Sequence, residues 1–204
     1  MELRAFDRIS PFVRMMRVKH DLSIAGKWQD IDHVFTLITS GSADFIVDGV
    51  RYTLERGSVI LIPPFCTHLI VSKNGETLVQ NILHFDFYED PDRCDLVHED
   101  VLEQNQPKVV PDREKLLGGS VFVTRLPGDR VAYFEDLYGR TYSEFKDVCM
   151  DAGSPALLRA YCTQLLIETL RSGHNVQPGM EPEPVRSKSW LHIENALERS
   201  GAHV

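Results

Sequence analysis

The sequence predicts a mainly β protein with a helical C-terminal part, in which an antiparallel barrel or sandwich is followed by two to three helices. Two observations carry this prediction. Short apolar segments follow one another up to about residue 88, at roughly the 8–12-residue spacing that is typical of sandwiches and barrels. After residue 127, apolar residues recur at helical spacing instead.

The strands are delimited by turn signals. Asp48-Gly49 and Asn74-Gly75 are residue pairs that favour tight hairpin turns. Gly41-Ser42 separates two more apolar segments. We therefore expect strands at residues 34–40, 43–47, 51–54, 58–62, 68–72 and 78–88. The segment 90–119 is acidic and irregular, and no element is assigned to it.

Two longer helices are expected after this segment. The first follows Pro127, and its apolar residues Val131, Phe134 and Tyr138 lie on one face. The second begins at Ser154-Pro155, which has the pattern of an N-cap residue followed by proline at the first helical position. It stops near Gly173.

The second helix has an apolar face wider than one contact needs. Its apolar residues form two adjacent stripes, with Leu157, Tyr161 and Leu165 on one and Leu158, Cys162, Leu166 and Leu170 on the other. Two interpretations stay open: a helix wedged between the barrel and the first helix, or the surface of a homodimer. In the second case we expect the dimer contacts at Leu157, Leu158, Tyr161 and Leu165.

Composition sets limits on function. A share of 43% hydrophobic and 25% charged residues in 204 residues is ordinary for a globular protein. A net charge of −8 argues against direct binding of DNA phosphates. The four cysteines are far apart, which argues against structural zinc and disulfides. Without an apolar run long enough to span a bilayer or a signal-peptide pattern, we expect a cytoplasmic protein with no membrane contact.

The segment around His68 resembles a known motif. Gly57, Pro63 and His68 are spaced as in the second cupin motif, with Phe65 where a glycine is usual and Ser72 where an asparagine is usual. The run "HVFTLITSGSADFIVDGVRYTLERGSVILIPPFCTH", followed by "NILHFDF", is similar to the sensor domain of AraC-family transcription regulators. The resemblance implies a cupin-like antiparallel β-barrel of the double-stranded β-helix, or jelly-roll, type.

The resemblance extends more loosely to the C-terminal residues. The proline-rich and charged segment 175–189 has the composition of a linker. Beyond it, "WLHIENALERS" resembles the opening helix of a DNA-binding helix-turn-helix unit, whose recognition helices are not in this sequence. Two explanations stay open: a fragment cut at this boundary, or a natural sensor-only relative.

The same comparison argues against a metal site. Catalytic cupins usually offer three histidines and a glutamate to one ion. Val34 stands where the motif has its glutamate, and two histidine positions fall on or beside Trp28 and Asp30, so that His68 alone is left. We expect neither a metal nor another cofactor. His68 remains either a donor that lines a pocket or a structural histidine.

Strand alternation suggests which residues line a pocket. Side chains two positions apart on a strand share a face, and the resemblance places ligands near the mouth of the barrel. Lys27 and Trp28 precede the strand at residues 34–40, where they could cover a ligand. We expect these ligand-binding residues: Lys27, Trp28, Thr36, His68, Ile70, Gln80, Ile82 and His84.

The face of Trp28 suits the C–H face of a sugar ring, although Trp28 could instead plug the end of the barrel. The strand region begins at Pro11. Arg14 and Arg17 lie on opposite faces of a first strand there, before residue 34, and periodicity cannot choose which one faces inward.

With these observations, the resemblance implies a domain that binds a small effector, such as a carbohydrate, that dimerises, and that controls attached DNA-binding domains. The predicted parts are an effector-binding barrel at 1–110, a helical dimerisation region at 111–174, the linker at 175–189 and the start of a truncated helix-turn-helix domain at 190–204. DNA would be contacted only through the missing domain. The alternative is a small metal-dependent cupin enzyme, an isomerase or dioxygenase, but the sequence contains no nucleophile with its base and no paired-carboxylate site.

Overall fold

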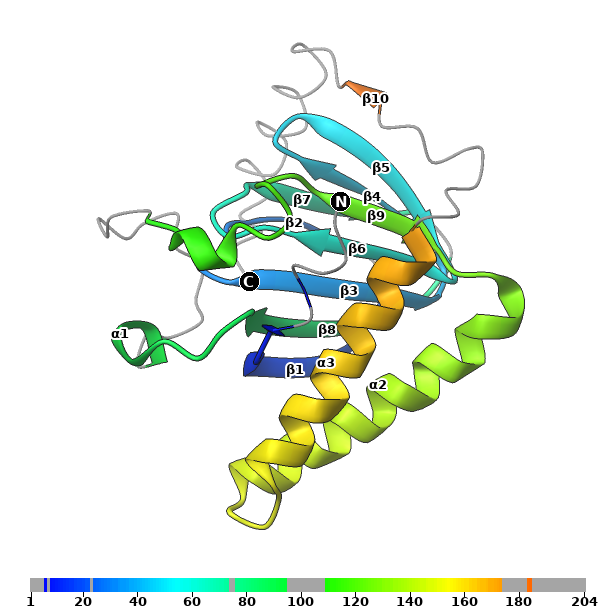
Figure 1. Cartoon of the computed structure of the whole chain (residues 1–204). Coiled ribbons are helices and arrows are strands. Elements are labelled where there is room, and N and C mark those ends of the chain that lie inside the picture. Colours follow the sequence, from blue (N-terminus) through cyan, green and yellow to red (C-terminus); the bar gives the residue numbers. More distant parts are fainter. Residues whose placement is uncertain are drawn as a thin grey trace.

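Two antiparallel β-sheets face each other, and a hairpin of two long helices lies along one of them (Figure 1). The computed structural model describes residues 6, 8–22, 24–73, 76–94, 109–173 and 183–184. The predicted linker and helix-turn-helix segment therefore lie outside the described residues, apart from 183–184.

The first sheet has, in spatial order, β1 (Phe12–Asp21), β8 (Leu78–Asp86), β3 (His33–Ser40), β6 (Ser58–Ile62) and β9 (Phe122–Arg125). The second sheet has, in the same sense, β10 (Glu183–Pro184), β5 (Val50–Glu55), β4 (Ser42–Val47), β7 (His68–Ser72) and β2 (Ala25–Trp28). Neighbouring strands are antiparallel throughout both sheets.

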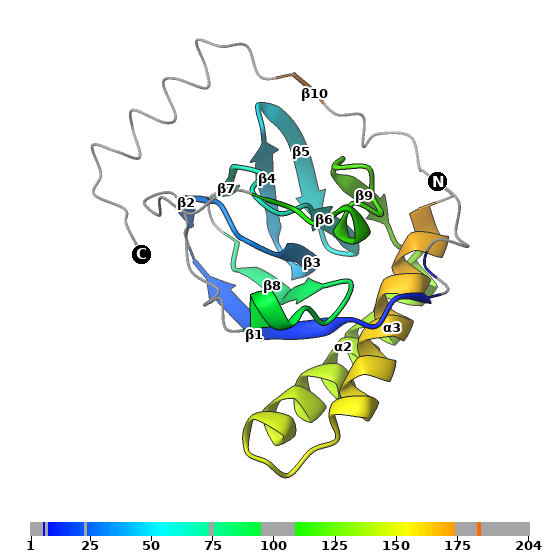
Figure 2. The same ribbon diagram turned by 60° about the vertical axis from the view of Figure 1, so that its left-hand side comes forward.

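The helical elements are α1 (Pro91–Cys94), the short 3-10 helix η3 (Asp112–Glu114), α2 (Gly128–Cys149) and α3 (Pro155–Ser172). Figure 2 shows α2 and α3 side by side next to β1. The Ser154 hydroxyl accepts a hydrogen bond from the Leu157 amide at 3.3 Å, and Pro155 is the first helical residue, so the predicted N-cap of α3 is confirmed.

Strands β3, β6 and β8 of the first sheet each contribute side chains to two hydrophobic cores. Their inward residues, such as Val34 and Ile60, pack with Phe45 of the second sheet. Their outward residues, such as Phe35 and Leu83, pack with the apolar faces of α2 and α3. Because side chains alternate along a strand, one sheet separates the interior of the β-sandwich from the helical layer.

The predicted antiparallel β architecture followed by helices is confirmed. Asp48 and Gly49 both have positive φ angles, 45° and 81°, as a type I′ hairpin turn between β4 and β5 requires. Three strands were not foreseen: β2, β9 and β10. β10 lies in the predicted linker, and β9 pairs with β6 although it lies beyond residue 110, where the sequence predicts that the barrel ends. Their short lengths make these strands hard to find by periodicity.

Among the described residues, no helix is both long and apolar enough to cross a lipid bilayer.

Candidate functional site

A cavity of about 210 Å³ lies between the two sheets and is lined from both of them. Of the residues predicted to bind a ligand, all except Lys27 line this cavity: Trp28, Thr36, His68, Ile70, Gln80, Ile82 and His84. The structure thus brings together residues from β2, β3, β7 and β8. Whether they bind a ligand stays a prediction.

Cross-strand register explains this convergence. Residues that pair directly across antiparallel strands point to the same face. Read across β1, β8 and β3, the rows are Met15–His84–Val34, Arg17–Ile82–Thr36 and Lys19–Gln80–Ile38. In the second sheet, Trp28 pairs with His68.

Lys27 does not line the cavity, in contrast to the prediction. It neighbours Trp28 on β2 and pairs with Leu69, so the alternation that points Trp28 into the cavity points Lys27 away from it. Lys27 is half-buried on the opposite face of the second sheet.

The first strand supplies the lining residues that sequence reasoning missed. Met15, Arg17 and Lys19 line the cavity, whereas Arg14 is buried in an ion network elsewhere. A register irregularity between Val13 and Met15 breaks the alternation at this point. The period-two pattern of 15, 17 and 19 was visible in the sequence, but nothing in it indicated which face was inward.

Trp28 and His68 form one wall of the cavity. Their rings are stacked, with centroids 6.2 Å apart and an interplanar angle of 26°. His68 Nδ1 lies 3.2 Å from the carbonyl oxygen of Cys66, and because a carbonyl can only accept, Nδ1 carries the proton. His68 Nε2 lies 3.6 Å from Asp30 Oδ2. His68 is therefore a cavity residue that is also held in place by its neighbours.

The opposite wall contains a polar pair on β8. His84 Nδ1 lies 3.0 Å from Asp32 Oδ1, which fixes the ring orientation. Gln80 is fully buried, and its Nε2 donates to Asp21 Oδ2 at 3.4 Å. Gln80 Oε1 has no hydrogen-bond donor among the described residues.

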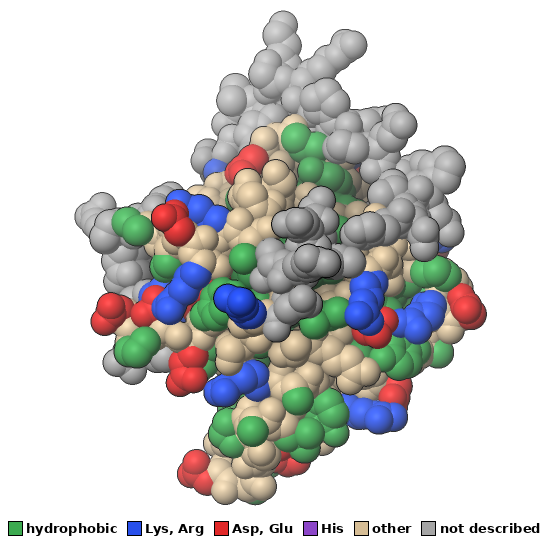
Figure 3. All heavy atoms as spheres, in the orientation of Figure 1, with side chains coloured by type: hydrophobic (Ala, Val, Ile, Leu, Met, Phe, Trp, Pro, Cys, Tyr) green, Lys and Arg blue, Asp and Glu red, His purple; other side chains and the backbone are tan. Residues whose placement is uncertain are grey.

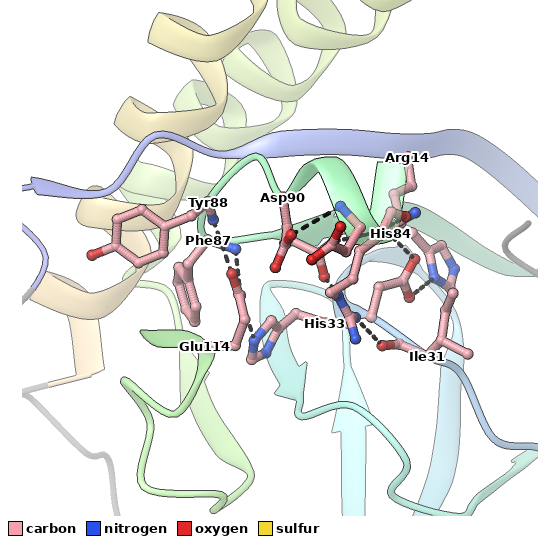
Figure 4. A network of polar contacts seen from close by, with 12 residues as sticks. Arg14, Ile31, His33, His84, Phe87, Tyr88, Asp90 and Glu114 are labelled. Atoms are coloured by element: carbon pink, nitrogen blue, oxygen red, sulfur yellow. Dashed lines mark hydrogen bonds and ion pairs between the residues drawn. The ribbon is translucent and has the colours of Figure 1, made fainter. Parts of the chain in front are cut away.

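Behind His84 the polar contacts continue as a buried ion network, drawn in Figure 4. Asp32 lies 3.9 Å from Arg14 Nε, and Arg14 Nε donates to Asp86 Oδ2 at 2.9 Å. Arg93 of α1 donates to Asp86 Oδ1 at 3.2 Å and to the carbonyl of Ile31 at 2.7 Å. Burial raises the pKa of Asp86, and the attraction of the two arginines only partly offsets this.

His33 has a structural environment outside the cavity. Its ring stacks on Phe85, and its Nε2 lies 3.3 Å from Glu114 Oε2 (Figure 4). Glu114 also accepts from the backbone amides of Phe87 and Tyr88 at 2.6 and 3.1 Å. Within the described ranges, no group of three or more His, Cys, Asp and Glu side chains could hold a metal ion.

The predicted dimer residues on α3 do not share a surface. Leu158 is 7% and Leu165 is 0% exposed, because both pack inside the chain's own core. Leu157 is 40% exposed and Tyr161 is half-buried. The assignment of Leu158 and Leu165 is therefore wrong: α3 contacts both the first sheet and α2, and this uses most of its wide apolar face. Figure 3 shows this side of the molecule, where hydrophobic side chains of the helical hairpin lie among charges of both signs.

Comparisons with known proteins add to this geometry. No curated protein matches the chain. Among solved structures, an apo form of ToxT from Vibrio cholerae strain SCE256 is 13% identical, covering 93% of this chain and 70% of that one at a TM-score of 0.47. Wild-type ToxT with a bound unsaturated fatty acid, from the same strain, is 12% identical, covering 91% and 69% at a TM-score of 0.45.

A third solved structure, salicylate 1,2-dioxygenase from Pseudaminobacter salicylatoxidans, is 16% identical, covering 34% of this chain and 21% of the enzyme at a TM-score of 0.32. The chain thus spans only a small part of that enzyme. The family description "AraC-like ligand binding domain" matches residues 20–175, from the end of β1 through α3. Because this match extends over more than half of the sequence, the chain belongs to the family of AraC-like ligand-binding domains.

Proposed function

We propose that this domain binds a small effector in the cavity between its sheets and controls DNA-binding domains attached to it. The observation that carries the proposal is the Trp28–His68 wall opposite buried polar groups of β8, in one cavity within the region that matches the family. A few polar groups in an otherwise apolar, concave site are typical of small-molecule recognition.

The size and chemistry of the cavity support a small, hydroxyl-bearing effector. A volume of about 210 Å³ lies below the roughly 300–1,000 Å³ of pockets that hold drug-sized ligands. Trp28 offers an aromatic face, and Thr36 and Gln80 offer hydrogen-bonding groups. This combination is the basis on which we propose a carbohydrate.

We also propose that the effector is bound without being converted. Among the lining residues, none is a serine or cysteine nucleophile. Cys66 lies near the cavity wall, but burial, followed by the charge of Asp48, raises the pKa of its thiol to about 12. The thiol is therefore protonated at neutral pH and is a poor nucleophile.

Homodimerisation stays part of the proposal, with a revised surface. Leu157 and Tyr161 turn outward from α3, and Met150 is 68% exposed at the C-terminal end of α2. These side chains could meet a second copy without disturbing the core.

The test is calorimetric titration and thermal unfolding with a panel of neutral sugars, sugar acids and fatty acids. A ligand that binds only the folded domain raises its melting temperature. We expect one class to bind, and Trp28→Ala to abolish this binding while the domain stays folded. A complete panel without binding would contradict the proposal.

A further inference from the structure

Two cations of β1, Arg17 and Lys19, line the cavity, and among the described residues a carboxylate lies within 4 Å of Lys19 but not of Arg17. The Nε and Nη2 atoms of Arg17 lie 3.1 and 2.7 Å from the sulfur of Met15, a weak acceptor. Lys19 Nζ forms an ion pair with Asp21 Oδ1 at 3.9 Å, a distance that is longer than a hydrogen bond. Within the described part of the chain, both groups thus have donor capacity left for a ligand.

The cavity lining has charges of both signs, in a protein whose net charge is −8. The lining contains one carboxylate, that of Asp30, whose Oδ2 faces His68 at 3.6 Å. The lining also contains Arg17 and Lys19, and Asp21 lies beside it, 3.9 Å from Lys19 Nζ and 3.4 Å from Gln80 Nε2. Among the described residues, Arg17 is therefore the lining cation without a carboxylate within 4 Å, and its guanidinium can bind an anionic ligand.

Gln80 specifies a second chemical group. Its Nε2 donates to the carboxylate of Asp21, which fixes the amide so that Oε1 is the remaining acceptor. This oxygen belongs to a fully buried side chain in the cavity wall and has no donor among the described residues. A buried acceptor without a donor is unfavourable, so a ligand hydroxyl at this position would be bound favourably.

Lys19, Gln80 and Trp28 lie close together in the cavity wall. Lys19 and Gln80 pair directly across β1 and β8, and directly opposed residues hold their Cβ atoms about 5 Å apart. Lys19 Nζ also lies 5.6 Å from the centre of the Trp28 ring. A cation, a hydroxyl acceptor and an aromatic face therefore converge on one small region of the cavity.

We infer that the effector is a hydroxylated carboxylate of sugar-acid type, in which a hydroxyl lies close to the carboxylate. Arg17 and Lys19 bind the carboxylate, Gln80 Oε1 accepts from the hydroxyl, and Trp28 covers the C–H face. A neutral sugar leaves Arg17 without an anion, and a fatty acid leaves Gln80 without a donor. This inference rests on the proposed function and specifies its ligand class.

The experiment uses matched probes. Each of three hexuronates, glucuronate, galacturonate and mannuronate, is compared with its parent hexose, which differs only in having CH₂OH for the carboxylate. Cyclohexanecarboxylate supplies a carboxylate without hydroxyls. By titration calorimetry, we expect at least one hexuronate to bind tenfold or more tightly than both its parent hexose and cyclohexanecarboxylate, with an affinity that falls as salt rises.

Variants test the two cations and the Gln80 acceptor separately. The double variant Arg17→Gln with Lys19→Gln should weaken hexuronate binding at least tenfold. Gln80→Leu should weaken the hexuronate but leave cyclohexanecarboxylate unchanged. Arg140→Gln, which removes an exposed cation of α2, is the control and should change neither.

The outcomes distinguish this inference from the proposed function. A parent hexose that binds as tightly as its hexuronate, with no effect of the double variant, overturns the inference and leaves a ligand-binding domain for neutral sugars. Equal binding of cyclohexanecarboxylate overturns the assignment of Gln80. If no probe binds and no other member of the wider panel does, both proposals fall.

Discussion

The hydroxyl of Tyr138 in α2 lies 2.8 Å from the carbonyl oxygen of Arg17, on the far side of the strand whose Arg17 side chain lines the cavity. The same hydroxyl lies 2.7 Å from the carbonyl oxygen of Ile82, the direct partner of Arg17 on β8. One helix side chain is therefore attached to the backbone of two adjacent cavity residues. A shift of either strand on ligand binding would reach α2 through this contact.

The first prediction removes this contact. Tyr138→Phe should lower the free energy of unfolding by about 1–3 kcal/mol, because two partly buried carbonyl oxygens lose the hydroxyl proton that they share. Urea denaturation measures this change. Tyr133→Phe is the matched control: it loses a hydrogen bond from Gln164, but that bond is exposed, so a change within about 0.5 kcal/mol is expected. Equal losses in both variants would show that the contact to the strands has no special role.

The second prediction concerns the packing of the Trp28 ring against Gly26. A Cβ atom added at Gly26 would lie 2.1 Å from Trp28 Cη2, so Gly26→Ala must displace the ring. In a Trp190→Phe background, the fluorescence emission of Trp28 should shift to the red, and effector binding should weaken. Gly139→Ala is the control, since it lies in open space on α2 and alanine favours a helix by about 1 kcal/mol over glycine. An unchanged emission spectrum in Gly26→Ala would contradict the packing described here.

The third prediction uses the titration of Asp86. Burial raises its pKa in the folded state above an unfolded value of about 3.9. The folded state thus binds the proton of Asp86 more tightly than the unfolded state does. The stabilising contribution of Asp86 is therefore fully present below the unfolded pKa and is lost as pH rises through the folded pKa.

Asp86→Asn removes this titration. The difference in unfolding free energy, wild type minus variant, should therefore decrease as pH rises from about 4. Urea denaturation of both proteins at a series of pH values measures it, and other titrating groups cancel in the difference. A difference that grows with pH would mean that the attraction of Arg14 and Arg93 outweighs burial.

The fourth prediction compares neighbouring faces of α3. Leu165→Glu should prevent stable folding, because a buried, unpaired carboxylate costs several kcal/mol. Leu157→Glu should leave the circular dichroism spectrum and melting temperature nearly unchanged, because Leu157 is exposed. If α3 forms the dimer, sedimentation should find wild type dimeric and Leu157→Glu monomeric. An unmodified protein that is already monomeric at tens of micromolar would rule out the dimer.

The sequence could predict which residues line the cavity where local patterns indicate which face of a strand points inward. The spacing from Gly57 to His68 resembled a motif, and the alternation of Gln80, Ile82 and His84 then followed from strand geometry. Even the departure at Phe65 is informative, because its φ of 62° retains the left-handed conformation for which the motif's glycine is suited. Local patterns are sufficient for such positions.

Other features depended on contacts between distant segments. The inward face of β1 could not be chosen, because the irregularity after Val13 interrupts its alternation. The two stripes of α3 were equally apolar, and only its simultaneous contact with α2 and the first sheet decides that Leu165 is internal. β9 owes its place to pairing with β6 and has too few residues to show a period.

The division of β8 between two cores has a consequence for engineering. Gln80, Ile82 and His84 face the cavity, whereas Leu83 and Phe85 belong to the core under the helices. Alternate residues of one strand thus line the cavity and support the helical layer. A library randomised only at positions 80, 82 and 84 would therefore change the cavity wall, while Leu83 and Phe85 keep the surface on which the helices pack.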